Sequence, residues 1–208
     1  MKGSFDRTVL GCAIALILWT IMFSPWTSPY VNFWVMMTCS GLILTTYSSL
    51  VSPGWWKEIK MGWSDIAIGI TLAAALWGIF WIGDRLSSLM FDFARPQINM
   101  IYGMKEGENP VVLTLLMLFI IGPAEEIFWR GFVQKSFSKR WNPTTGFIVT
   151  TLVYGLVHLA KFNFMLIMAA LVAGFVWGLA YRFFPERLGA IILSHALWDC
   201  AVFIWFPI

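Results

Sequence analysis

Apolar runs dominate the chain, and polar residues are concentrated between them. Seven runs approach or reach the roughly 17 to 25 residues that a helix needs to cross the hydrocarbon core of a membrane. Turn-forming segments such as Ser52-Pro53-Gly54 and Trp141-Asn142-Pro143 separate them. The pattern predicts an all-α, polytopic membrane protein with about seven transmembrane helices. The runs cover residues 8–23, 31–51, 66–83, 110–132, 144–160, 162–183 and 188–206.

A second periodicity lies in the long polar connection after the third run. Leu86, Leu89, Met90 and Phe93 recur at i, i+3, i+4 and i+7, which is the apolar stripe of an amphipathic helix. We expect either a short helix lying on the membrane surface or a simple cap between two spans.

The composition argues against a soluble domain and against a nucleic-acid-binding protein. The chain of 208 residues is 59% hydrophobic and 12% charged, whereas a soluble domain carries charge on about a quarter of its positions. The net charge of +3 is distributed in short clusters, so no contiguous basic surface for nucleic acid is expected. The lipid bilayer is therefore the expected surroundings, and a nucleic acid is not an expected partner.

The distribution of Lys and Arg predicts an orientation, because cytoplasmic loops are enriched in these residues. With the N-terminus inside, nine of them fall on the cytoplasmic side and four on the other. We therefore expect a multi-pass protein of the cell membrane with a cytoplasmic N-terminus. The inner set is Lys2, Arg7, Lys57, Lys60, Lys135, Lys139, Arg140, Arg182 and Arg187, and the outer set is Arg85, Arg95, Lys105 and Lys161.

Ionisable residues inside apolar runs indicate where function resides. Each costs at least about 2.5 to 3.5 kcal/mol at the bilayer centre, so it usually faces a protein interior or a wet cavity. Three pairs with i, i+4 spacing place both members on one helix face. Three spans are thus expected to present polar stripes to a common interior, with Glu125 and His158 at one level. The pairs are Glu126 with Arg130, Tyr154 with His158, and His195 with Asp199.

These residues form three motifs in a fixed order. Residues 125–130 match EExxxR, residues 154–158 approximate FxxxH with Tyr154 in place of Phe, and residues 195–199 match HxxxN/D with Asp199 in the last position. The chain resembles the CPBP family of intramembrane proteases, which includes CAAX-processing endopeptidases and bacteriocin-processing relatives. The resemblance covers roughly residues 110–206 and implies a catalytic core (110–208). We expect residues 1–109 to form N-terminal transmembrane helices and an outer amphipathic loop, integrated with the core in one membrane domain.

Peptide hydrolysis requires a base for the attacking water, donors for the oxyanion and an acid for the leaving amine. We expect Glu125 to activate the water with His158 as its partner, and Glu126 to pair with Arg130 as an organiser of the site. His195 would donate to the oxyanion. The resemblance implies the same roles for the first Glu, the FxxxH His and the last motif. Asp199 would orient His195, or donate to the oxyanion if it is protonated.

Other interpretations of the same residues remain open. Two Glu and two His side chains can ligate Zn²⁺, although the resemblance favours a glutamate-activated water with no metal or cofactor. A proton-coupled transporter also uses buried Glu, His and Arg, and the ion pairs can serve packing alone. The expected substrate is a membrane-anchored or lipidated protein or peptide. Prenylated CAAX proteins, pheromone or bacteriocin precursors and C-terminal sorting tags all fit.

Overall fold

The computed structural model describes residues 2–208, without the side chains of residues 2–4 and 58. This part of the chain contains helices and no strand, which confirms the predicted all-α class. Most of the short 3-10 turns between the helices contain or directly follow a Pro or Gly residue, as expected for chain reversals. The α-helices are α1 (Lys2–Phe23), α2 (Phe33–Val51), α3 (Trp63–Met90), α4 (Ala94–Tyr102), α5 (Pro110–Leu116), α6 (Gly122–Glu126), α7 (Lys135–Arg140), α8 (Pro143–Leu156), α9 (Phe164–Phe183) and α10 (Leu188–Cys200).

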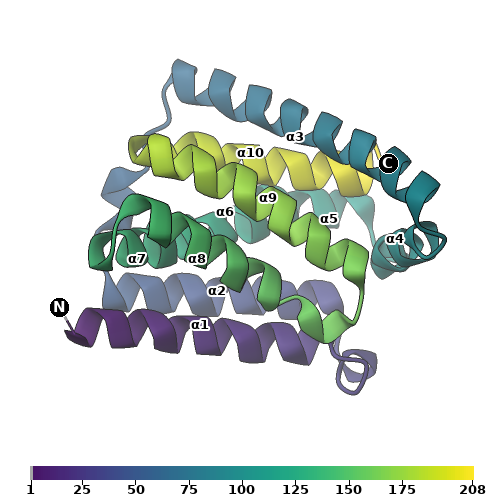
Figure 1. Ribbon diagram of the computed structural model, residues 1–208, viewed down its shortest axis with the longest axis horizontal. Helices are drawn as coiled ribbons and strands as arrows, with labels where there is room; N and C mark the ends of the chain where they lie inside the picture. The colour runs from purple at the N-terminus through teal and green to yellow at the C-terminus, as the bar shows by residue number, and fades with distance from the viewer. Residues whose placement is uncertain (1) are drawn as a thin grey trace.

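Seven helical segments in the described residues are long and apolar enough to cross a membrane, which confirms a multi-pass membrane protein. They pack side by side, with the two termini at opposite ends of the bundle (Figure 1). We call the end with the α2–α3, α7–α8 and α9–α10 connections the basic end, and the opposite end the α4 end. The segments are Phe5–Phe23, Phe33–Val51, Trp63–Met90, Pro110–Arg140, Pro143–Lys161, Phe164–Phe183 and Pro185–Trp205.

The fourth span is longer than the predicted 110–132 and is not a regular α-helix. Two π-helical segments, Met117–Ile121 and Ile127–Gln134, join α5, α6 and α7 into one continuous helix over Pro110–Arg140. Pro123 has no N–H to donate to the preceding turn, which favours an irregular helix at this point. π-helical segments frequently accompany functional sites, and these two lie directly before and after the α6 turn that carries Glu125 and Glu126.

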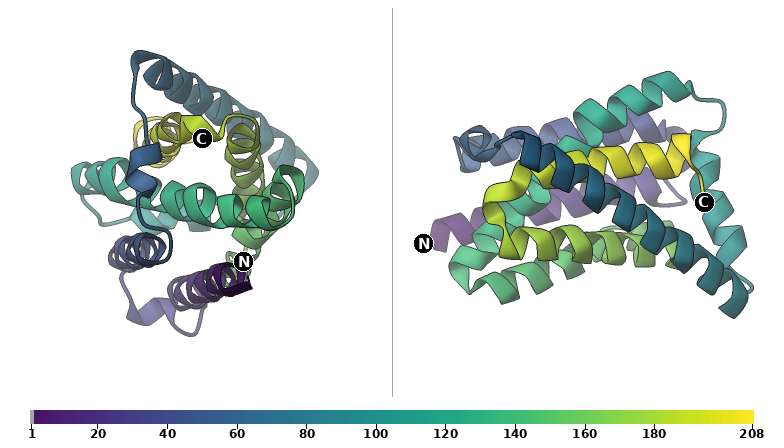
Figure 2. Two further views of the ribbon diagram at one scale, coloured as in Figure 1. Left: turned by 90° about the vertical axis from the view of Figure 1, so that its left-hand side faces the viewer. Right: turned by 90° about the horizontal axis from the view of Figure 1, so that it is seen from above.

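The predicted amphipathic helix is wrong in its position. α3 continues to Met90, so Leu86, Leu89 and Met90 are exposed on the last turns of the third span. No Pro or turn pair interrupts residues 83–90, and the helix therefore continues past Asp84. The separate short helix is α4, which follows it. At 1.5 Å per residue α3 is about 42 Å long, and it crosses the bundle obliquely (Figure 2).

Small residues allow the helices that carry the motifs to approach closely, as is common in membranes. A Cβ atom at Gly122 would lie 2.8 Å from Ala196 Cα, so this glycine sets the contact between α6 and α10. A Cβ atom at Gly174 would lie 2.8 Å from the Tyr154 ring, which fixes α9 against α8. The first contact joins two of the motif-bearing spans, and the second joins the third, α8, to its neighbour α9.

Candidate active site

A cavity of about 550 Å³ opens among the spans, and its walls are mostly apolar. Five of the seven predicted site residues line it, namely Glu125, Tyr154, His158, His195 and Asp199. All five are buried in the bundle. Glu126 and Arg130 do not line the cavity and are packed behind it, at 0% and 1% exposure. The structure therefore brings the three motifs together but divides their residues between two environments.

Glu125 faces the cavity from α6, between the two π-helical segments. Its Oε2 atom has no hydrogen-bond partner among the described residues. A buried carboxylate oxygen without a partner is costly unless water or a substrate group satisfies it. Glu125 thus has a free acceptor at the cavity wall.

His158 follows the last turn of α8 and makes two hydrogen bonds through its ring. Nδ1 lies 2.8 Å from the Tyr154 carbonyl oxygen, and Trp19 Nε1 donates to Nε2 over 3.2 Å. Because Nε2 accepts, the hydrogen-bond network assigns the proton to Nδ1. Phe23 and Tyr154 pack against the same imidazole. The contact of Trp19 with the site could not be predicted from the sequence, because a Trp in an apolar run resembles any other packing residue.

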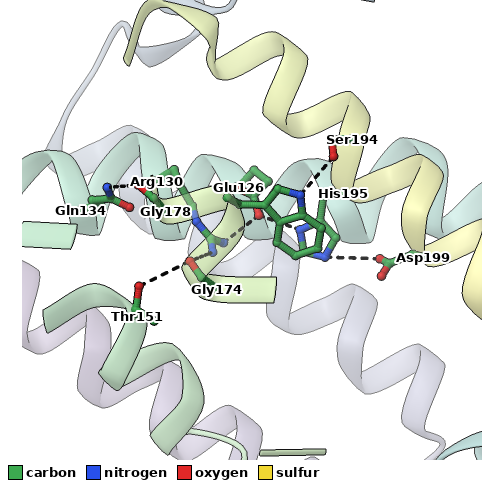
Figure 3. Close-up of polar contacts among 10 residues, drawn as sticks. Glu126, Arg130, Gln134, Thr151, Gly174, Gly178, Ser194, His195 and Asp199 are labelled. Atoms are coloured by element: carbon green, nitrogen blue, oxygen red, sulfur yellow. Dashed lines mark hydrogen bonds and ion pairs between the residues drawn. The ribbon is translucent and has the colours of Figure 1, made fainter. Parts of the chain in front are cut away.

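Four side chains form a continuous line of polar contacts, with Arg130 and Glu126 behind the cavity wall and His195 and Asp199 on it (Figure 3). Arg130 Nη1 donates to Glu126 Oε1 over 2.7 Å, and the same oxygen lies 2.7 Å from His195 Nδ1. His195 Nε2 lies 3.5 Å from Asp199 Oδ2. The expected Glu126–Arg130 ion pair is present. The carboxylate in closest contact with His195 is Glu126 rather than the expected Asp199.

Aromatic rings and main-chain carbonyls hold this line in place. The Trp177 ring stacks on His195 with a centroid distance of 3.9 Å, and its Nε1 donates to Ser194 Oγ. Arg130 donates to the Gly174 carbonyl and lies 5.0 Å from the centroid of the Tyr154 ring. Trp177 and Ser194 were not predicted from sequence. In the sequence, each of these two residues is distinguished only by a polar side-chain atom within an apolar run.

The described side chains do not form a group of three or more His, Cys, Asp or Glu residues that converge like metal ligands. Both ring nitrogens of His158 and the Nδ1 atom of His195 are already in hydrogen bonds. A zinc ion would have to displace these contacts to be bound by both histidines. The present arrangement therefore does not fit the zinc alternative, and chelation is the experiment that addresses it.

Part of the chain matches a known protein family. Residues 107–201, just under half of the chain, match the family described as Type II CAAX prenyl endopeptidase Rce1-like, and all seven predicted site residues lie within that range. An uncharacterized protein of Mycoplasma capricolum subsp. capricolum is 25% identical over 155 residues, which cover 69% of this chain and 44% of that protein. The chain thus spans less than half of the length of this relative. No solved structure matches the chain with significance.

Proposed function

We propose, from the match of residues 107–201 to the Rce1-like CAAX prenyl endopeptidase family, that this protein is an intramembrane endopeptidase whose nucleophile is a water molecule activated by Glu125. The observation that carries the proposal is the unpartnered Glu125 oxygen on the wall of a mostly apolar cavity that His158 and His195 also line. Such a group satisfies its hydrogen-bonding capacity by holding water.

In the first step, Glu125 accepts a proton from the bound water while the water oxygen attacks the carbonyl carbon of the substrate. The C=O double bond becomes a C–O⁻ single bond, and a tetrahedral intermediate forms. In the second step, the C–N bond breaks, and the proton held by Glu125 passes to the leaving nitrogen. The products are a carboxylic acid and an amine, and Glu125 returns to its starting state.

His195 supplies the donor for the oxyanion. Its Nδ1 atom already bonds to Glu126, so Nε2 donates only when the ring carries both protons. The carboxylates of Glu126 and Asp199 lie on its two sides. One of these two negative charges is balanced by the protonated His195 ring, and the other by Arg130. A preorganised donor of this kind typically contributes about 10²- to 10³-fold in rate.

His158 acts beside Glu125 by holding the water at its Nε2 atom. In the resting structure Trp19 occupies that acceptor, so the water shares or displaces the Trp19 hydrogen bond when the substrate is in place. The Nδ1 contact with the Tyr154 carbonyl keeps the ring in the tautomer whose Nε2 is unprotonated and can accept a hydrogen bond. Tyr154 therefore contributes its main-chain carbonyl to the orientation of His158.

The substrate is a membrane-anchored or lipidated protein or peptide, cut near the end of its chain. The cavity walls carry Phe, Trp, Ile and Met side chains from most of the spans, which suits an apolar segment or a lipid chain. The matched family is named for prenyl-CAAX substrates, which belong to that chemical class.

The test is co-expression with a panel of tagged, membrane-anchored candidate substrates, followed by mass spectrometry of new chain ends. Glu125→Gln should abolish a cleavage that the native protein performs. Glu186→Gln, the same substitution at an exposed residue of the basic end, is the matched control and should leave cleavage unchanged. Cleavage by Glu125→Gln at the native rate would remove Glu125 from the chemistry.

Purified protein should also retain cleavage after exhaustive chelation. A loss of activity that Zn²⁺ restores would replace the glutamate-activated water by a metal-activated one.

A further inference from the structure

The cavity is not central in the bundle but belongs to one end of it. On each of the seven spans, the lining residues come from the half nearest the α4 end, or from its midpoint. On α1 they are Trp19 and Phe23, in its last turns, and on α9 they begin at Phe164, in its first turn. His158 is only three residues from Lys161, where its span ends.

The two ends differ in charge. Nine Lys and Arg residues lie near the basic end and four near the α4 end, and the membrane rule places the richer side in the cytoplasm. At the α4 end, Arg95 is paired with Asp84 at 2.6 Å, and Lys105 donates to the Phe203 carbonyl. The basic end is therefore the expected cytoplasmic side, and the cavity lies on the opposite side.

α4 covers the cavity along the bundle axis. Ile98, Ile101 and Tyr102 of this helix line the cavity, so α4 forms its roof. The Arg95–Asp84 pair ties α4 to α3, while Gln97 accepts from Met165 N over 3.0 Å and so ties it to α9. Access straight through the α4 end is thus obstructed by a helix anchored on both sides.

The side of the bundle between α3 and α9 is more open. Ile79 and Gly83 on α3, and Phe164 and Met168 on α9, line the cavity and are classed as exposed. A Cβ atom built at Gly83 would meet no atom within 4 Å. We call the position between these four residues, where the cavity would open to the lipid beneath α4, the slot.

We propose that substrates reach Glu125 from the extracytoplasmic half of the membrane through this slot, and that they are exported, membrane-anchored peptides cut in an extended apolar segment. The substrate class rests on the proposed function, whereas the route does not. A transmembrane helix is 10 to 12 Å wide and about 30 Å long, so on the order of 3,000 Å³ would be needed to enclose it. A cavity of about 550 Å³ takes an unwound segment or one lipid chain, but not an intact helix.

The sidedness is tested with two serines on α3, each changed to cysteine in a background with Cys12→Ala and Cys39→Ala. Ser64 is exposed near the basic end, and Ser88 is exposed near the α4 end. The probe is a membrane-impermeant maleimide, and the parent with Cys200 alone measures the background. In intact cells, Ser88→Cys should be labelled, and Ser64→Cys should react only after the cells are broken. Labelling of Ser64→Cys in intact cells, with Ser88→Cys protected, would overturn the proposed side.

The slot is tested by adding bulk to a Ser87→Cys protein in the same background, because Ser87 lines the cavity. The probe is a lipid-soluble, membrane-permeant maleimide, since the slot opens to lipid. Gly83→Trp should slow labelling of Cys at position 87 at least tenfold, because the indole fills the slot. Gly78→Trp is the matched control, since Gly78 lies on the same helix with no atom within 4 Å of its built Cβ but does not line the cavity. Equal labelling rates in the two Trp variants would refute the slot. All labelling is repeated with Glu125→Gln, so a failure of the proposed chemistry leaves the route tested separately.

Discussion

Glu125 and Glu126 are neighbours in sequence but belong to two different regions of the molecule. Each carboxylate has one oxygen without a partner among the described residues, but Glu125 lines the cavity, whereas Glu126 lies in the packed interior. The other oxygen of Glu126 bonds both Arg130 and His195. Successive residues of a helix point about 100° apart, so one turn of α6 serves both regions. A motif of adjacent ionisable residues can therefore combine a reacting group with a structural one.

The cavity region should respond to substitution chiefly in activity. His158→Ala removes the proposed holder of the water and should lower the cleavage rate by roughly 10²- to 10⁴-fold. The imidazole touches Trp19, Phe23 and Tyr154, so the loss of packing should lower the melting temperature only modestly. Rate assays and thermal unfolding of the purified variant measure both effects, and near-native cleavage would disprove the role.

The packed region should respond chiefly in stability. Arg130→Ala leaves the Glu126 carboxylate buried without its cation, which should cost about 3 to 5 kcal/mol. Arg187→Ala is the control, because it removes a partly exposed ion pair with Asp65 near the basic end and should have a much smaller effect. Chemical unfolding in detergent measures the difference.

The double variant Glu126→Gln with Arg130→Met sharpens the same comparison. It removes both charges together, and it should recover expression and stability better than Arg130→Ala alone. If the double variant is no more stable than the single one, the ion pair is not the element that stabilises this region.

A smaller effect is expected at Trp19, which connects α1 to the site. Trp19→Phe removes the hydrogen bond to His158 Nε2, worth about 0.5 to 1.5 kcal/mol, and should change kcat by up to about tenfold. Trp129→Phe is the matched control, because Trp129 is equally buried but its Nε1 has no partner among the described residues. Equal changes in kcat for the two variants would reduce Trp19 to a packing role.

The smallest effect is expected for Asp199→Asn. Glu126 is the closer partner of His195, so the amide keeps an acceptor near Nε2 and should retain cleavage within about tenfold of the native rate. Asp199→Ala should lose more, because it removes that acceptor. An Asn variant as inactive as the Ala variant would show that the negative charge at position 199 is required.

The sequence predicted the class of fold well, because run length and turn residues report directly on membrane spans. It did not predict the length of the span over Pro110–Arg140, since π-helical segments leave no periodic signature in an apolar run. It also left open a surface helix over residues 86–93, because the stripe of apolar residues on the last turns of α3 has the same spacing.

The site could be predicted only in part. Spacing of i, i+4 indicates which residues share one helix face, and it correctly identified Glu126 with Arg130 as a pair. It does not indicate which neighbouring helix each face contacts. The contacts of Glu126 with His195, and of Trp19 with His158, join residues 69 and 139 positions apart, so they arise from the packing of the bundle.

The most direct measurement compares Glu125→Gln with Glu126→Gln, two identical substitutions at adjacent positions, for cleavage rate and for melting temperature in the same detergent. We predict that Glu125→Gln loses cleavage by at least about 10²-fold and melts like the native protein, while Glu126→Gln melts at a clearly lower temperature. Substantial cleavage by Glu125→Gln, or a melting temperature that falls for Glu125→Gln and not for Glu126→Gln, would contradict the assignment of the two glutamates.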